Sequence, residues 1–216
     1  MPFSERSHLI SPELEAQLGL LFAKLTGDVQ LFCIPGDDEK SREMVVFLNH
    51  LVSLTPRLSL RVLIPGEDAA LDLALDPSLL PATGVGGPLP RMVFHGVPGG
   101  KEMTAFAAAI LNAGGGAKEL PWLTRREIET IQAPMKLQVL VSLACSHCAQ
   151  LVANAQRIAW ENPLVTAHMI DANLYPELVA EQKLDRVPMT VVNGRKKLPG
   201  GRTLLELAIL LRKRFL

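Results

Sequence analysis

The chain alternates between two patterns of hydrophobic and polar residues. Short apolar runs that end at glycine, proline or a polar residue are typical of strands, and apolar residues that recur every three or four positions are typical of amphipathic helices. In the first half of the chain, these patterns predict strands at 29–34, 58–64 and 91–95. They predict helices at 12–27, 39–53, 68–75 and 101–113.

The second half repeats this alternation. Strands are predicted at 136–143, 164–170, 188–193 and 196–199. Helices are predicted at 124–132, 146–160, 174–183 and 203–214. Two helix starts carry residues that cap free backbone N–H groups, namely Ser11 before a proline and Thr124 with Glu127 in a capping box. The Asn193-Gly194 pair predicts a hairpin, because both residues tolerate positive φ.

Two pairs of segments are alike in the two halves. FHGVPGGKEMTAFAAAIL at 94–111 resembles VNGRKKLPGGRTLLELAILL at 192–211, and the strand-to-helix transition at 29–48 resembles the one at 139–158. A repeat length of about a hundred residues indicates two copies of one domain rather than a solenoid.

We therefore expect two units, at 1–116 and 117–216, joined through the linker GGGAKELPW at 114–122. Strands that alternate with helices, closed by a hairpin and a helix, predict an α/β fold with a mixed β-sheet and helices on both faces. This order of elements resembles tandem thioredoxin-like folds. The first would be a scaffold without a Cys-x-x-Cys motif, and the second would carry the active motif CSHC at 145–148.

Composition narrows the classes of partner. The 22 basic and 22 acidic residues balance, and aromatic residues make up only 5% of the chain, so no charge excess or stacking surface indicates nucleic acid. The start of the sequence has no apolar stretch behind a basic one, as a secretory signal would, and no apolar run has the length of a membrane span. We expect a cytoplasmic protein that binds neither nucleic acid nor membrane.

Cys145 and Cys148 form the one closely spaced cysteine pair. A thiol attacks as its thiolate, and the backbone N–H groups and positive dipole end of the helix predicted at 146–160 favour that charge. Cys148 lies one turn into the helix, on its apolar side, where it can resolve a mixed disulfide. The alternatives are two small core residues or half of a metal site. A structural zinc site normally needs four thiolate or imidazole ligands, so we expect no metal and no other cofactor, with Cys145 the nucleophile and Cys148 the resolving residue.

Val187-Pro188 stands where the last hairpin begins. A proline removes a hydrogen-bond donor from a sheet, and an X-Pro bond in this place is a candidate cis peptide. The resemblance to thioredoxin-like folds implies that this proline packs beside the active disulfide and that the backbone of Val187 binds the substrate polypeptide.

The first unit lacks the redox pair. Pro35 and Asp38 stand at the spacing of the two cysteines, and Leu89-Pro90 is the candidate counterpart of the second proline. Cys33 falls within a predicted strand, where a buried apolar thiol is expected. We expect this unit to set the geometry of partner binding without exchanging disulfides.

Several motifs together resemble the N-terminal domain of the alkyl hydroperoxide reductase AhpF, in which two fused thioredoxin-like folds carry one Cys-x-x-Cys pair. The motifs are CSHC, NPLVTAHMIDA at 162–172, VPMTVVNG at 187–194 and GGRTLLEL at 200–207. The two-fold protein disulfide oxidoreductases of thermophiles are related. The resemblance implies a relay of electrons, by dithiol–disulfide exchange, from a flavoprotein disulfide reductase to a peroxiredoxin or another disulfide protein.

The sequence departs from that family in two places. Members continue into FAD- and NADH-binding modules, and no glycine-rich turn here has the strand-to-helix context of a dinucleotide site, so we expect the flavoprotein donor to act in trans. Gln138 stands where the family has an acid, and the predicted strand 136–143 contains no carboxylate that could accept the proton of Cys148. A general protein disulfide reductase or isomerase, and a redox-inert adaptor that only binds a partner, stay open as alternatives.

His147 lies between the cysteines, where an imidazole either favours the Cys145 thiolate or is an exposed residue with little effect. We predict that the pKa of Cys145 lies below that of a free thiol, about 8.5. The rate of iodoacetamide alkylation as a function of pH measures it, and a midpoint at or above that value contradicts the prediction. The His147→Ala variant shows whether the imidazole contributes.

Overall fold

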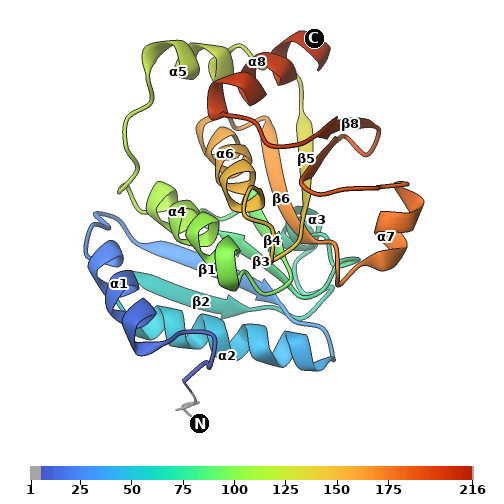
Figure 1. Ribbon diagram of the computed structural model, residues 1–216. Helices are drawn as coiled ribbons and strands as arrows, with labels where there is room; N and C mark the ends of the chain where they lie inside the picture. The colour runs from blue at the N-terminus through green and yellow to red at the C-terminus, as the bar shows by residue number, and fades with distance from the viewer. Residues whose placement is uncertain (1–5, 216) are drawn as a thin grey trace.

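The computed structural model describes residues 6–215, and its strands form one mixed eight-stranded sheet in the order β2-β1-β3-β4-β6-β5-β7-β8 (Figure 1). The strands of the first half are β1 Val29–Ile34, β2 Leu58–Val62, β3 Ala82–Val85 and β4 Met92–His95. Those of the second half are β5 Met135–Val141, β6 Val165–Asp171, β7 Met189–Val192 and β8 Lys196–Pro199.

The two halves have the same strand pairing. In the first half, β1 pairs parallel with β2 and antiparallel with β3, and β3 pairs antiparallel with β4. In the second half, β5 pairs in the same way with β6 and β7, and β7 with β8. Parallel pairing of β4 with β6 joins the halves into one sheet. The segment between 113 and 122, where we placed the division into two units, contains no helix or strand.

Helices cover both faces of the sheet. They are α1 Pro12–Phe22, α2 Glu39–Ser53, α3 Ala69–Leu75, α4 Met103–Ala113 after the 3-10 turn η1 Gly100–Glu102, α5 Trp122–Glu129, α6 Cys148–Glu161, α7 Pro176–Glu181 and α8 Leu204–Phe215. Residues of α3 and α7 pack against one face, in two small hydrophobic clusters, and the remaining helices pack against the other. The predicted α/β class with a mixed sheet and helices on both faces is confirmed.

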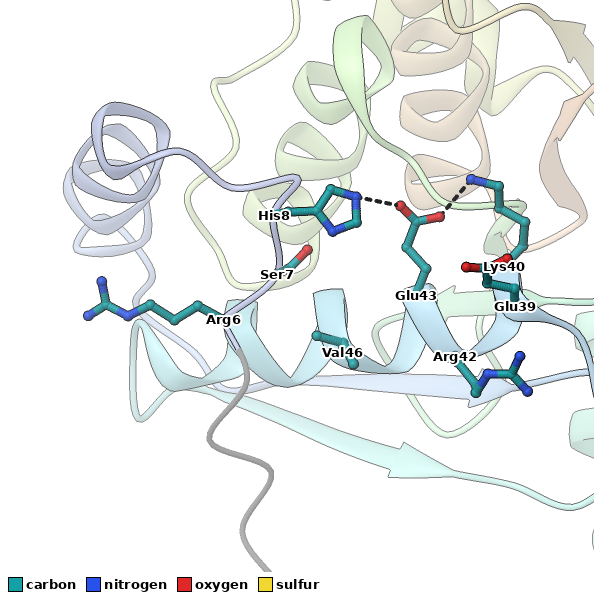
Figure 2. A pocket seen from close by; sticks show the side chains of 8 residues that line it. All are labelled: Arg6, Ser7, His8, Glu39, Lys40, Arg42, Glu43 and Val46. Carbon is teal, nitrogen blue, oxygen red and sulfur yellow. Dashed lines mark hydrogen bonds and ion pairs between the residues drawn. The ribbon is translucent and has the colours of Figure 1, made fainter.

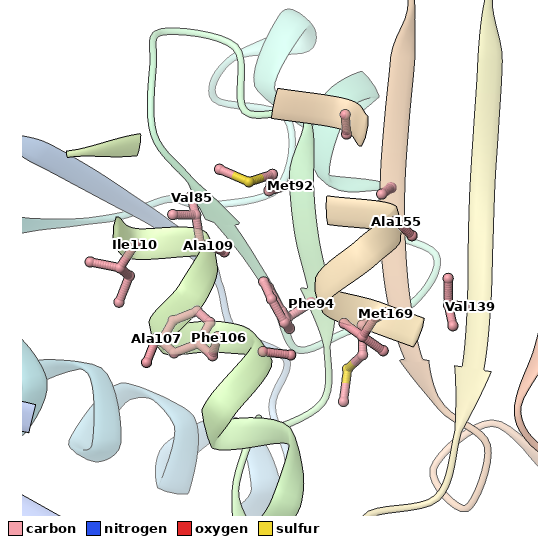
Figure 3. Close-up of a cluster of buried hydrophobic side chains, with 14 of the residues drawn as sticks. Val85, Met92, Phe94, Phe106, Ala107, Ala109, Ile110, Val139, Ala155 and Met169 are labelled. Atoms are coloured by element: carbon pink, nitrogen blue, oxygen red, sulfur yellow. The ribbon is translucent and has the colours of Figure 1, made fainter. Parts of the chain in front are cut away.

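A single hydrophobic cluster runs through both halves (Figure 3). Phe94 on β4 packs edge-on against Phe106 of α4, with ring centroids 4.9 Å apart. Met169 on β6 and Ala155 on α6 continue the same cluster, and all four side chains are fully buried. Apolar side chains removed from water in one continuous cluster resist separation of the halves, because separation would expose them again.

Buried polar contacts also cross between the halves. Nε2 of His95 on β4 lies 2.9 Å from Nδ1 of His168 on β6, and Nδ1 of His95 lies 2.7 Å from the carbonyl oxygen of Leu79. Burial lowers the pKa of His95 to about 4 and that of His168 well below its usual value. Both imidazoles are therefore neutral at pH 7, which suits a hydrogen-bonded pair within a core.

Most predicted elements are present, with ends that differ by a few residues. The strands at 29–34 and 196–199 and the helix at 39–53 have the predicted bounds. Asn193 and Gly194 both have positive φ, 50° and 66°, as the hairpin prediction requires. No helix in the described part of the chain is long and apolar enough to span a membrane.

The first helix is shorter than predicted and ends at Phe22 rather than near Gly27. The backbone N–H groups of Thr26 and Gly27 donate to the carbonyl oxygen of Gly114, at 2.9 and 3.0 Å. This segment is therefore bound to the end of α4 instead of continuing its own helix. A contact between such distant parts of the chain leaves no trace in the local periodicity.

The capping-box prediction at Thr124 is wrong. The helix α5 begins at Trp122, directly after Pro121, and Thr124 is buried within it. The carboxylate of Glu127 accepts a hydrogen bond from Nε of Arg212 at 2.7 Å, so it connects α5 to α8 instead of capping its own helix.

The strand β3 was not predicted, and the identification of Pro90 as a counterpart of Pro188 is wrong as a result. Residues 82–85 are short and contain Thr and Gly, so they lack a strand-like apolar run. In the structure, the cis bond Leu80–Pro81 precedes β3 just as the cis bond Val187–Pro188 precedes β7. Pro81 is therefore the counterpart, and Pro90 lies in the turn between β3 and β4.

Candidate functional site

Cys145 and Cys148 are joined in a disulfide at the end of the sheet where β5 leads into α6. Their Cα atoms are 5.5 Å apart. The loop 142–147 that carries Cys145 begins where β5 ends, and the backbone N–H of Cys145 donates to the carbonyl oxygen of Ser142 at 2.8 Å. The predicted redox pair is thus in its oxidised form.

The two sulfur-bearing residues differ in exposure. Cys148 is fully buried in the main hydrophobic cluster, among Leu151, Val152 and Ala155 of α6, whereas Cys145 is partly exposed at the margin of that cluster. A partner can therefore reach Cys145 but not Cys148. This asymmetry suits an attacking residue and a resolving residue.

The helix starts later than predicted. Its first residue is Cys148, so Cys145 lies in the preceding loop rather than at the helix start, and the disulfide holds its sulfur at the N-terminal end of α6. His147 is the N-cap residue, but its side chain forms no capping hydrogen bond. It is exposed, so the structure places it beside the cysteines without a contact that would fix its imidazole.

The Val187–Pro188 peptide bond is cis, as predicted. Pro188 is buried, and its carbonyl oxygen accepts the backbone N–H of Gly200 at 2.9 Å. Val187 is partly exposed and, like Cys145, packs at the margin of the main hydrophobic cluster. Binding of a substrate backbone by Val187 stays a prediction.

The first half contributes a carboxylate that the sequence analysis missed. Glu102 in η1 is fully buried, and no hydrogen-bond partner is found for either of its carboxylate oxygens among residues 6–215. Burial, followed by the charge of Asp171, raises the pKa of Glu102 to about 7. Burial also raises the pKa of Asp171, which ends β6.

The turn that holds Glu102 lies against the cysteine loop. The preceding residue, Lys101, donates from Nζ to the carbonyl oxygen of Ala144 at 3.2 Å, and Gly100 lies close to the carbonyl oxygen of Leu143. The proton acceptor that strand β5 lacks at Gln138 is therefore available from the other half of the molecule. The sequence held no sign of this, because Glu102 reads as an acid in the first turn of a helix.

The positions that match the cysteines in the first half have structural roles. The side chain of Asp38 caps α2 by accepting the backbone N–H of Ser41 at 2.7 Å. Cys33 is buried on β1, as predicted, and burial raises the pKa of its thiol to about 12. This half therefore has no reactive thiol in its described residues.

A cavity of about 660 Å³ lies over the start of α2 and is separate from the disulfide (Figure 2). In it, Nε2 of His8 and Nζ of Lys40 point toward the carboxylate of Glu43, at 3.1 and 2.7 Å. Neither cysteine lines this cavity. Within the described residues, no group of three or more His, Cys, Asp or Glu side chains is placed to hold a metal ion.

Comparison with known proteins extends these observations. A family model described as "Thioredoxin domain" matches residues 135–209. The alkyl hydroperoxide reductase AhpF of Staphylococcus aureus (strain Mu50) is 26% identical over 199 residues, which cover 92% of this chain and 37% of that protein. The chain likewise spans 36% of the length of another curated relative.

Solved structures agree. The NTD_N/C domain of the alkyl hydroperoxide reductase AhpF from Enterococcus faecalis is 31% identical, with a TM-score of 0.87, and the match covers 93% of this chain and 99% of that one. A protein disulfide oxidoreductase from Aeropyrum pernix is 16% identical with a TM-score of 0.83, covers 94% of this chain and 92% of that one, and shows a likeness of fold.

The fold and the partly exposed disulfide define a thiol–disulfide oxidoreductase of the thioredoxin-like class. The match over almost the whole of the Enterococcus domain shows more. The chain belongs to the family of the N-terminal domain of the alkyl hydroperoxide reductase AhpF. The family and the fold class inferred from the motifs are thus confirmed.

The raised pKa of Glu102 has a consequence for stability. Its native pKa, about 7, exceeds the ordinary value of 4.5, so the native state binds more protons than the unfolded state between these values. The free energy of unfolding therefore falls as pH rises through this window, and the cost is complete above it. We predict that Glu102→Gln gains stability relative to the wild type between about pH 5 and pH 8, by on the order of 1–2 kcal/mol.

Urea unfolding of both proteins at the two pH values measures this difference. The exposed linker residue Glu119 provides a matched control, because Glu119→Gln removes the same charge from a solvated position. A stability difference for Glu102→Gln that does not change with pH contradicts the assignment of a raised pKa.

Proposed function

We propose that this protein relays electrons, two at a time, from a flavoprotein disulfide reductase module to the disulfide of a peroxiredoxin. The observation that carries the proposal is the disulfide between a partly exposed and a fully buried cysteine, in a chain of this family. The names of the relatives connect the family with the reduction of alkyl hydroperoxides. The flavoprotein donor and the peroxiredoxin acceptor of this chain are part of the proposal.

The exchange follows from the exposure of the two sulfurs. In the reduced protein, the Cys145 thiolate attacks one sulfur of the partner disulfide, which forms a mixed disulfide and releases one partner thiolate. The Cys148 thiolate then attacks the sulfur of Cys145 and releases the second partner thiolate. Two electrons pass to the partner, and the Cys145–Cys148 disulfide is restored. A dithiol of the donor reverses this exchange and reduces the protein again.

Cys148 must lose its proton before it can attack, and it is enclosed in an apolar cluster that disfavours the thiolate. We infer that Glu102 accepts this proton. Its pKa of about 7, raised by burial, suits an acceptor near neutral pH, and its carboxylate oxygens have no hydrogen-bond partner among the described residues. The first half would then supply part of the chemistry and would be more than the scaffold that the sequence led us to expect.

The Cys148→Ser variant tests the order of attack. It keeps the attacking sulfur and lacks the resolving one, so we expect a stable mixed disulfide between Cys145 and an oxidised peroxiredoxin. Cys145→Ser should form none, because the remaining thiol is buried. Non-reducing electrophoresis with mass spectrometry of the linked peptides identifies the bond.

The same materials separate the alternatives. A relay for peroxiredoxins should reduce an oxidised peroxiredoxin faster than insulin or scrambled ribonuclease, whereas equal rates indicate a general protein disulfide reductase or isomerase. Partner binding and peroxide reduction that survive Cys145→Ser indicate a redox-inert adaptor and contradict the proposal.

The proposed role of Glu102 predicts a kinetic defect. With oxidised peroxiredoxin as substrate, Glu102→Gln should slow the resolution of the mixed disulfide at pH 7 by at least about tenfold, the low end of the usual contribution from a positioned general base. Stopped-flow measurement separates this step from formation of the mixed disulfide, which should stay within about twofold. Glu119→Gln is the control, and an unchanged resolution rate removes Glu102 from the mechanism.

A further inference from the structure

The cysteine loop is held by residues from both halves of the molecule. From the second half, Nδ2 of Asn173 donates to Oγ of Ser142 at 3.5 Å. From the first half, Nζ of Lys101 donates to the carbonyl oxygen of Ala144 at 3.2 Å. Gly100, with φ of 56°, packs its Cα side toward the carbonyl oxygen of Leu143. The turn η1 thus contacts the loop immediately before Cys145.

The Lys101 contact places a positive charge one residue before the attacking sulfur. A backbone carbonyl oxygen carries partial negative charge, which disfavours a neighbouring thiolate, and an ammonium group bound to that oxygen offsets it. The side chain of Lys101 is exposed, so solvent and salt screen the charge and keep its effect small.

Other charged and titratable groups lie around the loop, and they differ from Lys101 in their contacts. They are Glu102 on η1, His147 in the loop, Asp171 on β6, Tyr175 before α7 and Lys40 on α2, the last two acting electrostatically with Asp171. Within residues 6–215, Lys101 is the cationic side chain with a hydrogen bond to the loop.

We propose that Lys101 is a positioning residue for attack by Cys145, which it serves by holding the Ala144 carbonyl group and by favouring the thiolate through its charge. The proposal rests on the proposed function, in which Cys145 is the attacking residue. It assigns a specific task to the half of the molecule that has no redox cysteine pair: Lys101 activates the attacking sulfur, and its neighbour Glu102 serves the resolving one.

Substitutions at Lys101 separate charge from packing. Lys101→Met keeps the length of the side chain and removes its charge, Lys101→Arg keeps the charge and the donors, and Lys24→Met removes a charge from an exposed lysine outside the site. For each protein in its reduced form, alkylation by iodoacetamide is followed against pH, and mass spectrometry identifies the modified cysteine.

We expect the alkylation midpoint of Cys145 to rise by about half to one pH unit in Lys101→Met, equivalent to a roughly three- to tenfold lower thiolate fraction below the midpoint. Lys101→Arg and Lys24→Met should keep the wild-type midpoint. The difference between Lys101→Met and the wild type should shrink at about 1 M salt, where charges more than about 3 Å apart are screened.

Two outcomes overturn the inference. A Lys101→Met midpoint equal to that of the wild type removes the lysine from the activation of Cys145. An Arg variant shifted as far as the Met variant shows that packing, and not charge, matters at this position. Either result leaves the proposed function intact, whereas alkylation of wild-type protein at Cys148 in preference to Cys145 contradicts the proposed function itself. Circular dichroism confirms that each variant is folded.

Discussion

The parallel pairing of β4 with β6 is the contact on which the site depends. It places the end of the first half's sheet beside the strand that neighbours β5, and so brings the turn η1 against the cysteine loop. Without this pairing, Lys101 and Glu102 would belong to a domain that cannot reach either sulfur. The joint is reinforced by the shared hydrophobic cluster and by the His95–His168 hydrogen bond.

The chemistry divides between the halves in a way that follows from burial. The second half supplies both sulfurs, one partly exposed for attack on a partner and one enclosed for resolution. Its strand β5 presents Gln138 rather than a carboxylate, and the first half supplies Glu102 from a buried position. A carboxyl group of raised pKa can only be kept in a well-packed interior, and the junction of two cores provides one.

Much of this arrangement could be predicted from the sequence, because it depends on local patterns. The spacing of Cys145 and Cys148, the X-Pro bond before β7 and the repeated order of strands and helices each leave a mark within a few residues. What escaped prediction depends on distant partners. The strand β3 is stabilised by pairing on both sides rather than by its own composition, and the approach of Glu102 to the cysteine loop follows from the β4–β6 pairing alone.

Fusion into one sheet also changes how the molecule meets its neighbours in solution. Two separate four-stranded sheets would expose four strand edges with unpaired backbone groups, each a template for association with other chains. Because β4 and β6 cover one another, only β2 and β8 remain as outer strands among the strands of residues 6–215. The short β8, with two lysines and a proline among its four residues, is poorly suited to intermolecular pairing. The duplication therefore protects against aggregation as well as completing the redox site.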